Sequence, residues 1–438
     1  MEGGIYVRFF GNIKNENNIL SIAGVSAQVL AKEYGTPLYI MDEQLIRDNC
    51  RRFYKSFKAE GEHNKVAYAG KAFLTIAMCE IIKNEGLYLD VVSGGELYTA
   101  CKADFPLEKV YFHGNNKTID EIEMAIRLGV GTFVVDNLHE MEIIDEKAKK
   151  KGIIQRVILR VTPGIEAHTH DYIKTGQIDS KFGFTILNNE LEQVIRTALS
   201  LTNIKLSGLH CHIGSQIFEL EPYREAVHIM TSLIKNIKEK FNYDIEELDL
   251  GGGFGVYYDI GDEPKEIEDF CSAIIEEAKI KCKEFGINYP ILVIEPGRSI
   301  VANAGITLYT VGAIKDIPEV RKYVAVDGGM TDNIRPALYN AQYQCVLANK
   351  ISGPCTEVVT IAGKCCESGD ILLEGVKLPM VNSGDLMAVL STGAYGYSMS
   401  SNYNKIPKAP VVLVNEGSHK LICKRQTYQD MISNEVCL

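Results

Sequence analysis

Short apolar runs alternate along this chain with segments whose apolar residues recur every three or four positions. Runs such as "VAYA" (66–69) and "ILVI" (291–294) have the length of buried strands, and "TIDEIEMAIRLG" (118–129) has the spacing of an amphipathic helix. Eight strand–helix units in about 250 residues are typical of a closed (β/α)8 barrel. The predicted strands are 66–69, 88–92, 110–113, 132–135, 157–161, 206–211, 247–250 and 291–294.

The C-terminal third of the chain has a different pattern. From about residue 307, short β-rich runs such as "KYVAVDGG" and "TEVVTIAG" are separated by Gly, Pro and Asn turns, which is typical of an all-β domain. The N-terminal segment is extended and ends on the strand-like "TPLYIMD". We therefore predict an α/β plus all-β protein. Residues 42–306 form a TIM-type barrel, and residues 1–41 and 307–438 form a β-sandwich or β-barrel domain.

Residues of reactive types follow the predicted barrel strands. Lys71, His113 and His212 come after the first, third and sixth strands, while "GGGFG" (251–255) and "EPGRS" (295–299) come after the seventh and eighth. In a (β/α)8 barrel, the loops at the C-terminal ends of the strands hold the functional residues. Each residue alone has an ordinary structural interpretation, such as a solvent-directed lysine or a turn glycine. Their occurrence at one rim predicts an active site there.

The chemistry of these residues suits one cofactor. A lysine amine can form a Schiff base with an aldehyde, and a glycine run lets backbone N–H groups approach a phosphate. A carboxylate such as Glu295 can keep a ring nitrogen protonated, and a histidine can stack on a flat ring. Aldehyde, phosphate, ring nitrogen and ring face together describe pyridoxal 5′-phosphate. We predict this cofactor, with Lys71 as its anchor.

Several longer motifs occur in a characteristic order. They include "YAGKAF", "DVVSGGEL", "HGNNK", "AHTHDYIKTG", "HCHIGSQ", "LDLGGGFG", "EPGRSIVANAG", "CESGD" and "GAYGYSMSSNYN". With them the chain resembles the diaminopimelate decarboxylases over nearly its whole length, and "AHTHDYIKTG" and "CESGD" separate that family from the polyamine branch. The resemblance implies a carbon–carbon lyase that decarboxylates meso-2,6-diaminopimelate at its D centre. The products are L-lysine and CO2, in the last step of lysine biosynthesis.

The resemblance also implies roles for individual residues. Lys71 matches the Schiff-base lysine, His212 the histidine stacked on the cofactor, and Cys366 the proton donor. Cofactor-binding positions are Lys71, His212, Ser215, Gly252, Gly253, Glu295, Gly297, Arg298 and Tyr395. Substrate-binding positions are Arg298, Arg335, Tyr339, Glu367 and Tyr395. A homodimer with shared active sites is implied, in which the loop with Cys366 reaches the partner's barrel.

The chain departs from the family at a few positions. Lys364 stands where the family usually has a proline two residues before its catalytic cysteine, and Cys365 adds a thiol beside Cys366. Phe73 replaces an asparagine common in relatives. The donor of the Cα proton therefore stays open between Cys366 and Lys71, and the cysteine assignment could shift by one position.

Composition and charge limit the kinds of partner that we expect for this protein. A net charge of −11 disfavours nucleic acid and anionic membranes, and no apolar run is long enough to span a bilayer. The first residues lack the apolar core of a signal peptide. The twelve cysteines are scattered without the spacing of a zinc site. We expect a cytoplasmic protein with reduced thiols and no metal.

Two alternative functions remain. One is a pyridoxal phosphate decarboxylase for another amino acid, such as carboxynorspermidine or an ornithine analogue. The other is a non-catalytic regulator with the same fold, which would be expected to lose the cofactor residues that this chain keeps. The distal end of diaminopimelate has a carboxylate and an ammonium group. Arg298 and Arg335 suit the carboxylate and Glu367 suits the ammonium, so we favour diaminopimelate.

Overall fold

The computed structural model describes residues 7–58, 63–165, 180–186 and 190–438, and the chain divides into two compact units. The barrel unit comprises Asn49–Gly255 and Glu263–Gly297. The β unit comprises Met1–Asp48, Val256–Asp262 and Arg298–Leu438. These ranges differ from the predicted 42–306 because three stretches inside it, 42–48, 256–262 and 298–306, group with the β unit. The last two of these stretches contact each other. One contact between them is a hydrogen bond of 2.7 Å from Asn303 Nδ2 to the Tyr257 carbonyl oxygen.

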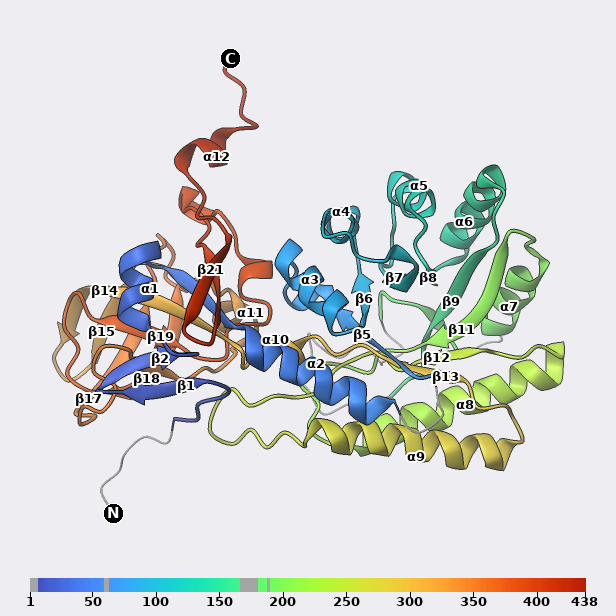
Figure 1. Cartoon of the computed structure of the whole chain (residues 1–438), viewed down its shortest axis with the longest axis horizontal. Helices are drawn as coiled ribbons and strands as arrows, with labels where there is room; N and C mark the ends of the chain where they lie inside the picture. The colour runs from blue at the N-terminus through green and yellow to red at the C-terminus, as the bar shows by residue number, and fades with distance from the viewer. Residues whose placement is uncertain (1–6, 59–62, 166–179, 187–189) are drawn as a thin grey trace. The chain divides into compact units, whose positions relative to one another are not determined.

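The barrel unit contains eight parallel strands in a closed ring (Figure 1). The first strand, β5 (Lys65–Ala69), pairs with the last, β13 (Ile291–Ile294), and this pairing closes the ring. A two-residue strand, β10 (Phe184–Thr185), adds to β9 outside the ring. The remaining strands are β6 (Tyr88–Val91), β7 (Val110–Phe112), β8 (Thr132–Val135), β9 (Gln155–Thr162), β11 (Ile204–His210) and β12 (Glu247–Asp249). The predicted barrel is confirmed.

Helices cover the outside of these strands (Figure 1). Helix α5 (Ile119–Leu128) shows how the sequence sets their limits: Thr118 and Glu121 form a capping box at its start, and Gly129 ends it with a φ of 83°. The others are α2 (Glu43–Phe57), α3 (Ile76–Asn84), α4 (Gly94–Lys102), α6 (Leu138–Lys151), α7 (Glu190–Ser200), α8 (Glu221–Phe241) and α9 (Ile267–Phe285). Single turns occur at η1 (Gly70–Ala72) and η2 (Leu107–Lys109).

The two ends of the barrel interior differ in chemistry. At the N-terminal ends of the strands, fully buried Glu247 accepts a hydrogen bond of 2.6 Å from the Tyr111 hydroxyl and pairs with Lys65. The charge of Glu247 is therefore compensated locally, and this end is structural. The residues that we predicted to be functional leave the opposite, C-terminal ends of the strands, as the fold requires.

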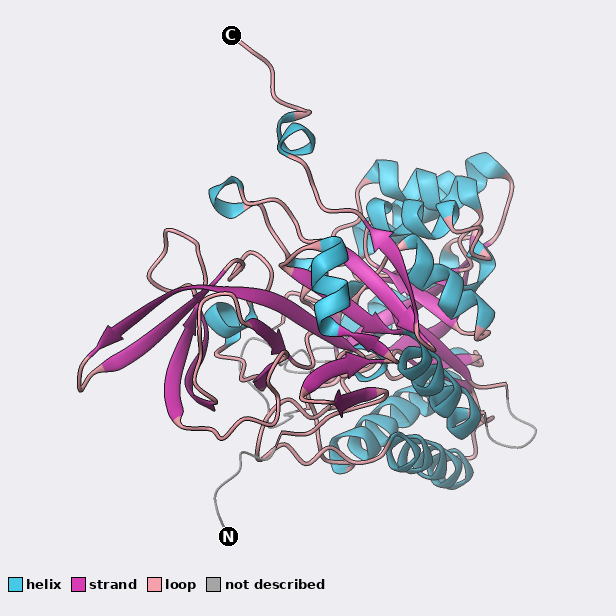
Figure 2. Cartoon of the chain, turned by 60° about the vertical axis from the view of Figure 1, so that its left-hand side comes forward, coloured by secondary structure: helices cyan, strands magenta, loops and turns pink. Residues whose placement is uncertain are grey.

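The β unit is built on a mixed nine-stranded sheet (Figure 2). Strand β4 (Leu38–Asp42), from the N-terminal segment, lies between β14 (Gly305–Ile317) and β20 (Val411–Asn415). Its remaining strands are β15 (Arg321–Val326), β16 (Cys345–Leu347), β17 (Glu357–Ala362), β18 (Ile371–Leu378), β19 (Leu386–Val389) and β21 (Ser418–Cys423). This sheet confirms the predicted β-rich second domain.

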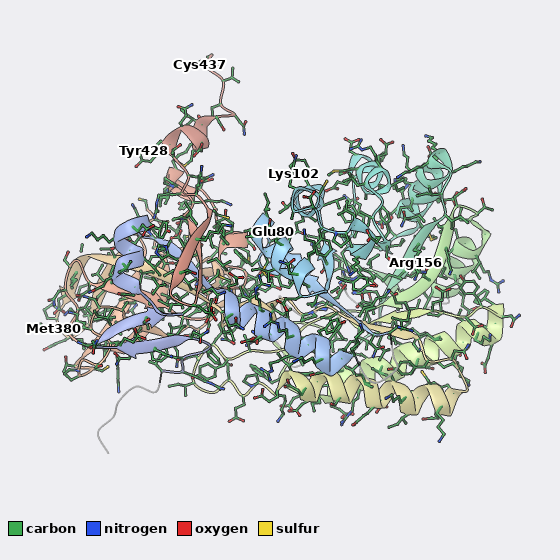
Figure 3. All side chains as sticks on the ribbon, in the orientation of Figure 1. Glu80, Lys102, Arg156, Met380, Tyr428 and Cys437 are labelled. Carbon is green, nitrogen blue, oxygen red and sulfur yellow. The ribbon has the colours of Figure 1, made fainter. Side chains whose placement is uncertain are left out.

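Smaller elements complete the β unit. A three-stranded sheet comprises β1 (Ile13–Glu16), β2 (Ile19–Ile22) and β3 (Val25–Ser26). The short helical elements are α1 (Ala27–Tyr34), α10 (Arg298–Val301), α11 (Arg335–Tyr339), η4 (Tyr397–Met399), η5 (Tyr403–Lys405) and α12 (Tyr428–Ile432). Figure 3 shows Tyr428 on α12 and Cys437 near the C-terminus, and both side chains are exposed.

Candidate active site

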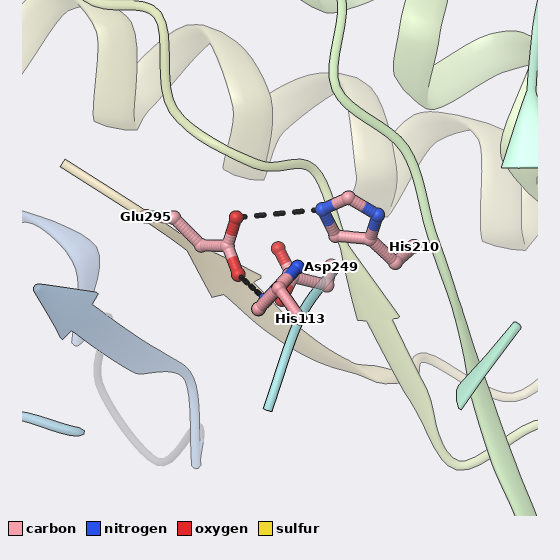
Figure 4. A group of neighbouring side chains, drawn as sticks. All are labelled: His113, His210, Asp249 and Glu295. Atoms are coloured by element: carbon pink, nitrogen blue, oxygen red, sulfur yellow. Dashed lines mark hydrogen bonds and ion pairs between the residues drawn. The ribbon is translucent and has the colours of Figure 1, made fainter. Parts of the chain in front are cut away.

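Four buried polar side chains meet at the C-terminal ends of the barrel strands (Figure 4). His210 and Asp249 are the last residues of β11 and β12, while His113 and Glu295 directly follow β7 and β13. One nitrogen or oxygen atom of each side chain lies within 4.8 Å of all the others. Adjacent parallel strands end at one rim, which explains why residues far apart in sequence converge here.

Glu295 is the centre of this group. Its Oε1 lies 2.6 Å from His113 Nε2, and its Oε2 lies 3.4 Å from His210 Nε2. Burial alone would raise the pKa of Glu295, but the facing imidazoles hold this pKa well below its usual range. Burial lowers the pKa of His210 to about 3, although Glu295 opposes this shift. The site therefore presents a charged Glu295 beside a neutral His210 at neutral pH.

His212 lies next to the glycine-rich loop. Its Nδ1 accepts a hydrogen bond of 3.3 Å from the Gly252 N–H, which places the proton of the neutral ring on Nε2. Burial, followed by the charge of Lys71, holds the pKa of His212 well below its usual value. A neutral, oriented imidazole is suited to packing against a flat ring.

Lys71 lies in the turn η1 at the tip of β5, and its side chain is exposed. The backbone around it is tightly packed. A Cβ on Gly70 would lie 2.8 Å from the Asp90 carbonyl oxygen, and a Cβ on Gly297 would lie 2.9 Å from the Ala69 Cβ. The strand tip is thus fixed, while the ammonium group extends out of the interior.

The glycine-rich loop is held against its two neighbouring loops. Gly253 has a φ of 101°, and a Cβ there would lie 2.4 Å from the Gly214 carbonyl oxygen. A Cβ on Gly252 would lie 2.2 Å from the Glu295 carbonyl oxygen. Only glycine allows these close approaches. The loop, the turn with half-buried Ser215 and Glu295 are therefore held at fixed positions relative to one another.

Other charged residues at this rim had no predicted role, although their positions at strand ends were a usable signal. Arg160 on β9 lies 3.9 Å from Asp136 through its Nε, and its guanidinium lies 4.2 Å from the Phe182 ring centre. Asp90 on β6 lies 3.8 Å from His113, and burial raises its pKa. Asp249 was also missed. All three are ionisable residues within barrel strands, and together they indicate that this end of the barrel interior is polar.

A second polar group lies in the β unit. Arg298 donates a hydrogen bond of 2.8 Å from Nη1 to the Tyr258 hydroxyl, and Arg335 donates one of 2.8 Å from Nε to the Tyr343 hydroxyl. Both guanidinium groups also lie over the ring of Tyr395, at 4.9 and 5.6 Å from its centre. Both arginines are buried, and this tyrosine-lined pair is suited to an anionic ligand.

Tyr395 has a backbone conformation that supports a functional role. Its φ of 59° lies in the left-handed region, which costs a non-glycine residue about 1–3 kcal/mol. The half-buried Tyr339 ring also lies near Arg335, with 5.6 Å between the guanidinium and the ring centre. The structure therefore brings together Arg298, Arg335, Tyr339 and Tyr395 and adds Tyr258 and Tyr343, which the motifs did not indicate.

The loop between β17 and β18 contains the two adjacent cysteines. Asp370 accepts hydrogen bonds from the Cys365 N–H (2.8 Å) and the Met330 N–H (2.6 Å), which tie this loop to the segment before Arg335. Burial, followed by the charge of Asp370, raises the pKa of Cys365 to about 11. Cys366 and Glu367 are exposed.

The structure shows how the loop is held at Lys364, where the family usually has a proline. The Lys364 N–H donates a hydrogen bond of 2.9 Å to the Gly328 carbonyl oxygen, which a proline could not donate. This hydrogen bond therefore holds the backbone of the loop, whereas a proline at position 364 would restrict it through its ring. The motif "AHTHDYIKTG" (167–176) lies outside the described residues.

Comparison with known proteins agrees with the barrel. Residues 43–302 match the pyridoxal-dependent decarboxylase family model, for its pyridoxal-binding domain. The chain is thus a pyridoxal-dependent decarboxylase, with pyridoxal phosphate as its cofactor.

Individual relatives show to which family of pyridoxal-dependent decarboxylases the chain belongs. The diaminopimelate decarboxylase of Bacillus methanolicus is 50% identical, over 98% of this chain and 100% of its own, and that of Bacillus subtilis is 49% identical, over 96% and 95%. The crystal structure of M. jannaschii diaminopimelate decarboxylase with L-lysine has a TM-score of 0.92, 36% identity and 98% coverage of both chains. The chain belongs to the diaminopimelate decarboxylase family. None of the helices in the described ranges is long and apolar enough to cross a membrane.

Proposed function

We propose that this protein removes the carboxylate at the D centre of meso-2,6-diaminopimelate as CO2 and releases L-lysine, which completes lysine biosynthesis. The observation that supports this most strongly is 50% identity over 98% of the chain to a diaminopimelate decarboxylase. The buried rim of the barrel unit and the paired arginines of the β unit fit the two chemical requirements of this reaction. These are an acidic partner for a ring nitrogen and a cationic partner for a carboxylate.

The barrel-rim residues would hold pyridoxal phosphate. Lys71 would anchor its aldehyde carbon, His212 would pack on its ring, and the loop at Gly252 and Gly253 would bind its phosphate together with Ser215. Gly297, Arg298 and Tyr395 are assigned as further cofactor contacts. When bound, this cofactor accepts the electron pair left behind by CO2. The residues present fit this cofactor, because Glu295 is a buried carboxylate suited to a protonated ring nitrogen and the glycine loop approaches its neighbours as only glycine can.

Glu295 is assigned to the ring nitrogen. Its carboxylate is buried and charged, and such a group favours a protonated nitrogen through a charge-assisted hydrogen bond worth about 1.5–3 kcal/mol. A protonated ring withdraws electrons more strongly than a neutral one. Glu295 therefore favours decarboxylation by keeping that proton in place.

A positioned acid must then deliver a proton to Cα. We assign this step to the thiol of Cys366, which is exposed in the single chain, with the Lys71 ammonium as the competing donor. Cys365 is a poorer candidate because burial and the charge of Asp370 raise the pKa of its thiol to about 11, which makes it a weaker acid. The proton leaves sulfur and forms the new C–H bond of lysine.

The distal end of the substrate is assigned to Arg298, Arg335, Tyr339 and Glu367. Two buried guanidinium groups attract the second carboxylate and repel the cationic end of ornithine, so a polyamine-type substrate is the weaker alternative. The assay is incubation with meso-diaminopimelate and chiral chromatography for L-lysine, with ornithine and carboxynorspermidine in parallel. Turnover of either alternative without formation of lysine would contradict the proposal.

Replacing Arg335 tests the substrate assignment directly. Arg335→Ala should raise KM for meso-diaminopimelate strongly while the cofactor stays bound, because loss of a buried charged partner costs about 2–5 kcal/mol. Steady-state kinetics and the cofactor absorption spectrum measure the two effects. Arg321→Ala is the matched control, since Arg321 pairs with Glu374 on the β-unit surface. An unchanged KM in Arg335→Ala would remove this residue from the substrate site.

We also propose a cytoplasmic homodimer with shared active sites. The exposure of Cys366, Glu367 and Ser368 on the single chain leaves the loop available to a partner's barrel. All twelve cysteines are free thiols, as expected in a reducing compartment. Analytical ultracentrifugation tests the dimer, and a monomer at assay concentration would contradict it.

A further inference from the structure

Asp249 and Glu295 place two carboxyl groups in one buried space. Asp249 is fully buried and Glu295 is 5% exposed. One oxygen of each belongs to the group of atoms that lie within 4.8 Å of one another (Figure 4). Two carboxylates this close in a low-dielectric interior cannot both be charged, so one of the two holds a proton.

We propose that Asp249 is the neutral member of this pair and donates a hydrogen bond to Glu295, which orients Glu295 toward the cofactor. Asp249 is therefore a positioning residue for the carboxylate assigned to the ring nitrogen. The inference rests on that assignment and deepens it.

The contacts of the two side chains distinguish them. Glu295 faces imidazole nitrogens on both of its oxygens, at 2.6 Å for His113 and 3.4 Å for His210. Asp249 Oδ1 accepts a hydrogen bond of 2.9 Å from the Gly251 N–H. In the described part of the chain, Asp249 Oδ2 is buried without a hydrogen-bond partner. A proton on Asp249 Oδ2 would make this atom a donor and let it bond to the neighbouring carboxylate of Glu295.

The surrounding charges agree with this arrangement. Burial, followed by the charge of Glu295, raises the pKa of Asp249 well above its usual range, while the imidazoles lower that of Glu295. One nitrogen of each imidazole lies within 4.8 Å of both carboxyls, and both imidazoles pair with Glu295, at 2.6 and 3.4 Å. The titratable groups around Asp249 include Glu247, Cys211 and Tyr111 from neighbouring strands, together with Glu295, His113 and His210.

A neutral Asp249 would have two effects on the site. Its carbonyl oxygen would hold the first residue of the glycine loop, and its hydroxyl would hold Glu295. One side chain would thus fix the spacing between the phosphate loop and the ring-nitrogen carboxylate. The pair would also have a single negative charge, which balances one protonated ring nitrogen.

The test compares Asp249→Asn with Asp249→Leu. Asparagine is neutral, has nearly the same shape, accepts from Gly251 and donates to Glu295. The cofactor dissociation constant and kcat of Asp249→Asn should therefore stay within about threefold of wild type. Leucine has similar size without polar atoms, and the lost hydrogen bond to a charged group should weaken cofactor binding about 10- to 150-fold. If Asp249 were charged, the asparagine variant would change the net charge of the pair and would be as damaging as leucine.

Infrared spectroscopy detects the proton on Asp249 directly. At neutral pH, the wild-type minus Asp249→Asn difference spectrum should contain the C=O stretch of a protonated carboxylic acid, in holoenzyme and cofactor-free protein alike. The proposal is overturned if this band is absent, or if Asp249→Asn misfolds or binds the cofactor as weakly as the leucine variant. Neither the infrared band nor the cofactor dissociation constant depends on the substrate. A failure to decarboxylate diaminopimelate would therefore contradict the proposed function without affecting the test of Asp249.

Discussion

Lys71→Ala should abolish both decarboxylation of meso-diaminopimelate and the absorption band of lysine-bound pyridoxal phosphate. Lys71 lies at the tip of β5, and its charge acts on His212, the residue assigned to the cofactor ring. Alanine removes the amine that bonds to the aldehyde but leaves the glycine loop and Glu295 in place. The cofactor should then bind weakly, be removed by dialysis and support activity only at background level. Absorption spectra before and after dialysis measure this effect.

Lys102→Ala is a suitable control for that experiment. Lys102 is exposed on α4 (Figure 3), where its ammonium group lies 5.2 Å from the Tyr98 ring centre. This surface substitution should leave the spectrum and the activity unchanged. Borohydride reduction followed by peptide mass spectrometry identifies the modified lysine. A reducible band that survives in Lys71→Ala would mean that another lysine holds the cofactor.

The barrel strands could be predicted from the sequence because both of their faces are buried. Ile291–Ile294 is a continuous apolar run, and its predicted limits match the structure. Strand β18 (Ile371–Leu378) was not predicted, because it mixes buried and exposed positions and contains Gly375 with a φ of 65°. The limits of the two units were also harder to predict. Tyr258 belongs with the β unit through its contact with Arg298, which no local pattern reveals.

The candidate site was predictable where a residue type is unusual for its position. Lys71 and Glu295 follow apolar strands, and the structure places both at the C-terminal rim of the barrel. Asp249 was missed because the predicted strand 247–250 places it inside the strand, and its partner Glu295 is 46 positions later in the chain. Tyr343 was missed because buried tyrosines are usually core residues. Its role appears only when Arg335 is seen to donate to it.

The proposed shared active site predicts that two inactive variants restore activity when mixed. Lys71→Ala damages the barrel unit and Cys366→Ala damages the β-unit loop, so each should be nearly inactive alone. If the loop of one chain completes the site of its partner, a mixed dimer has one intact site and one doubly damaged site. Random pairing makes about half of the dimers mixed, so co-refolding should restore about a quarter of wild-type activity.

Two controls make this result interpretable. Differently tagged chains and tandem purification show that mixed dimers have formed, and each variant refolded with itself gives the background activity. A loop that completed the site of its own chain would leave one defect in every site of a mixed dimer. Verified mixed dimers that stay as inactive as their parents would therefore place the whole site within one chain. Substantial activity of Cys366→Ala alone would instead make Lys71 the proton donor.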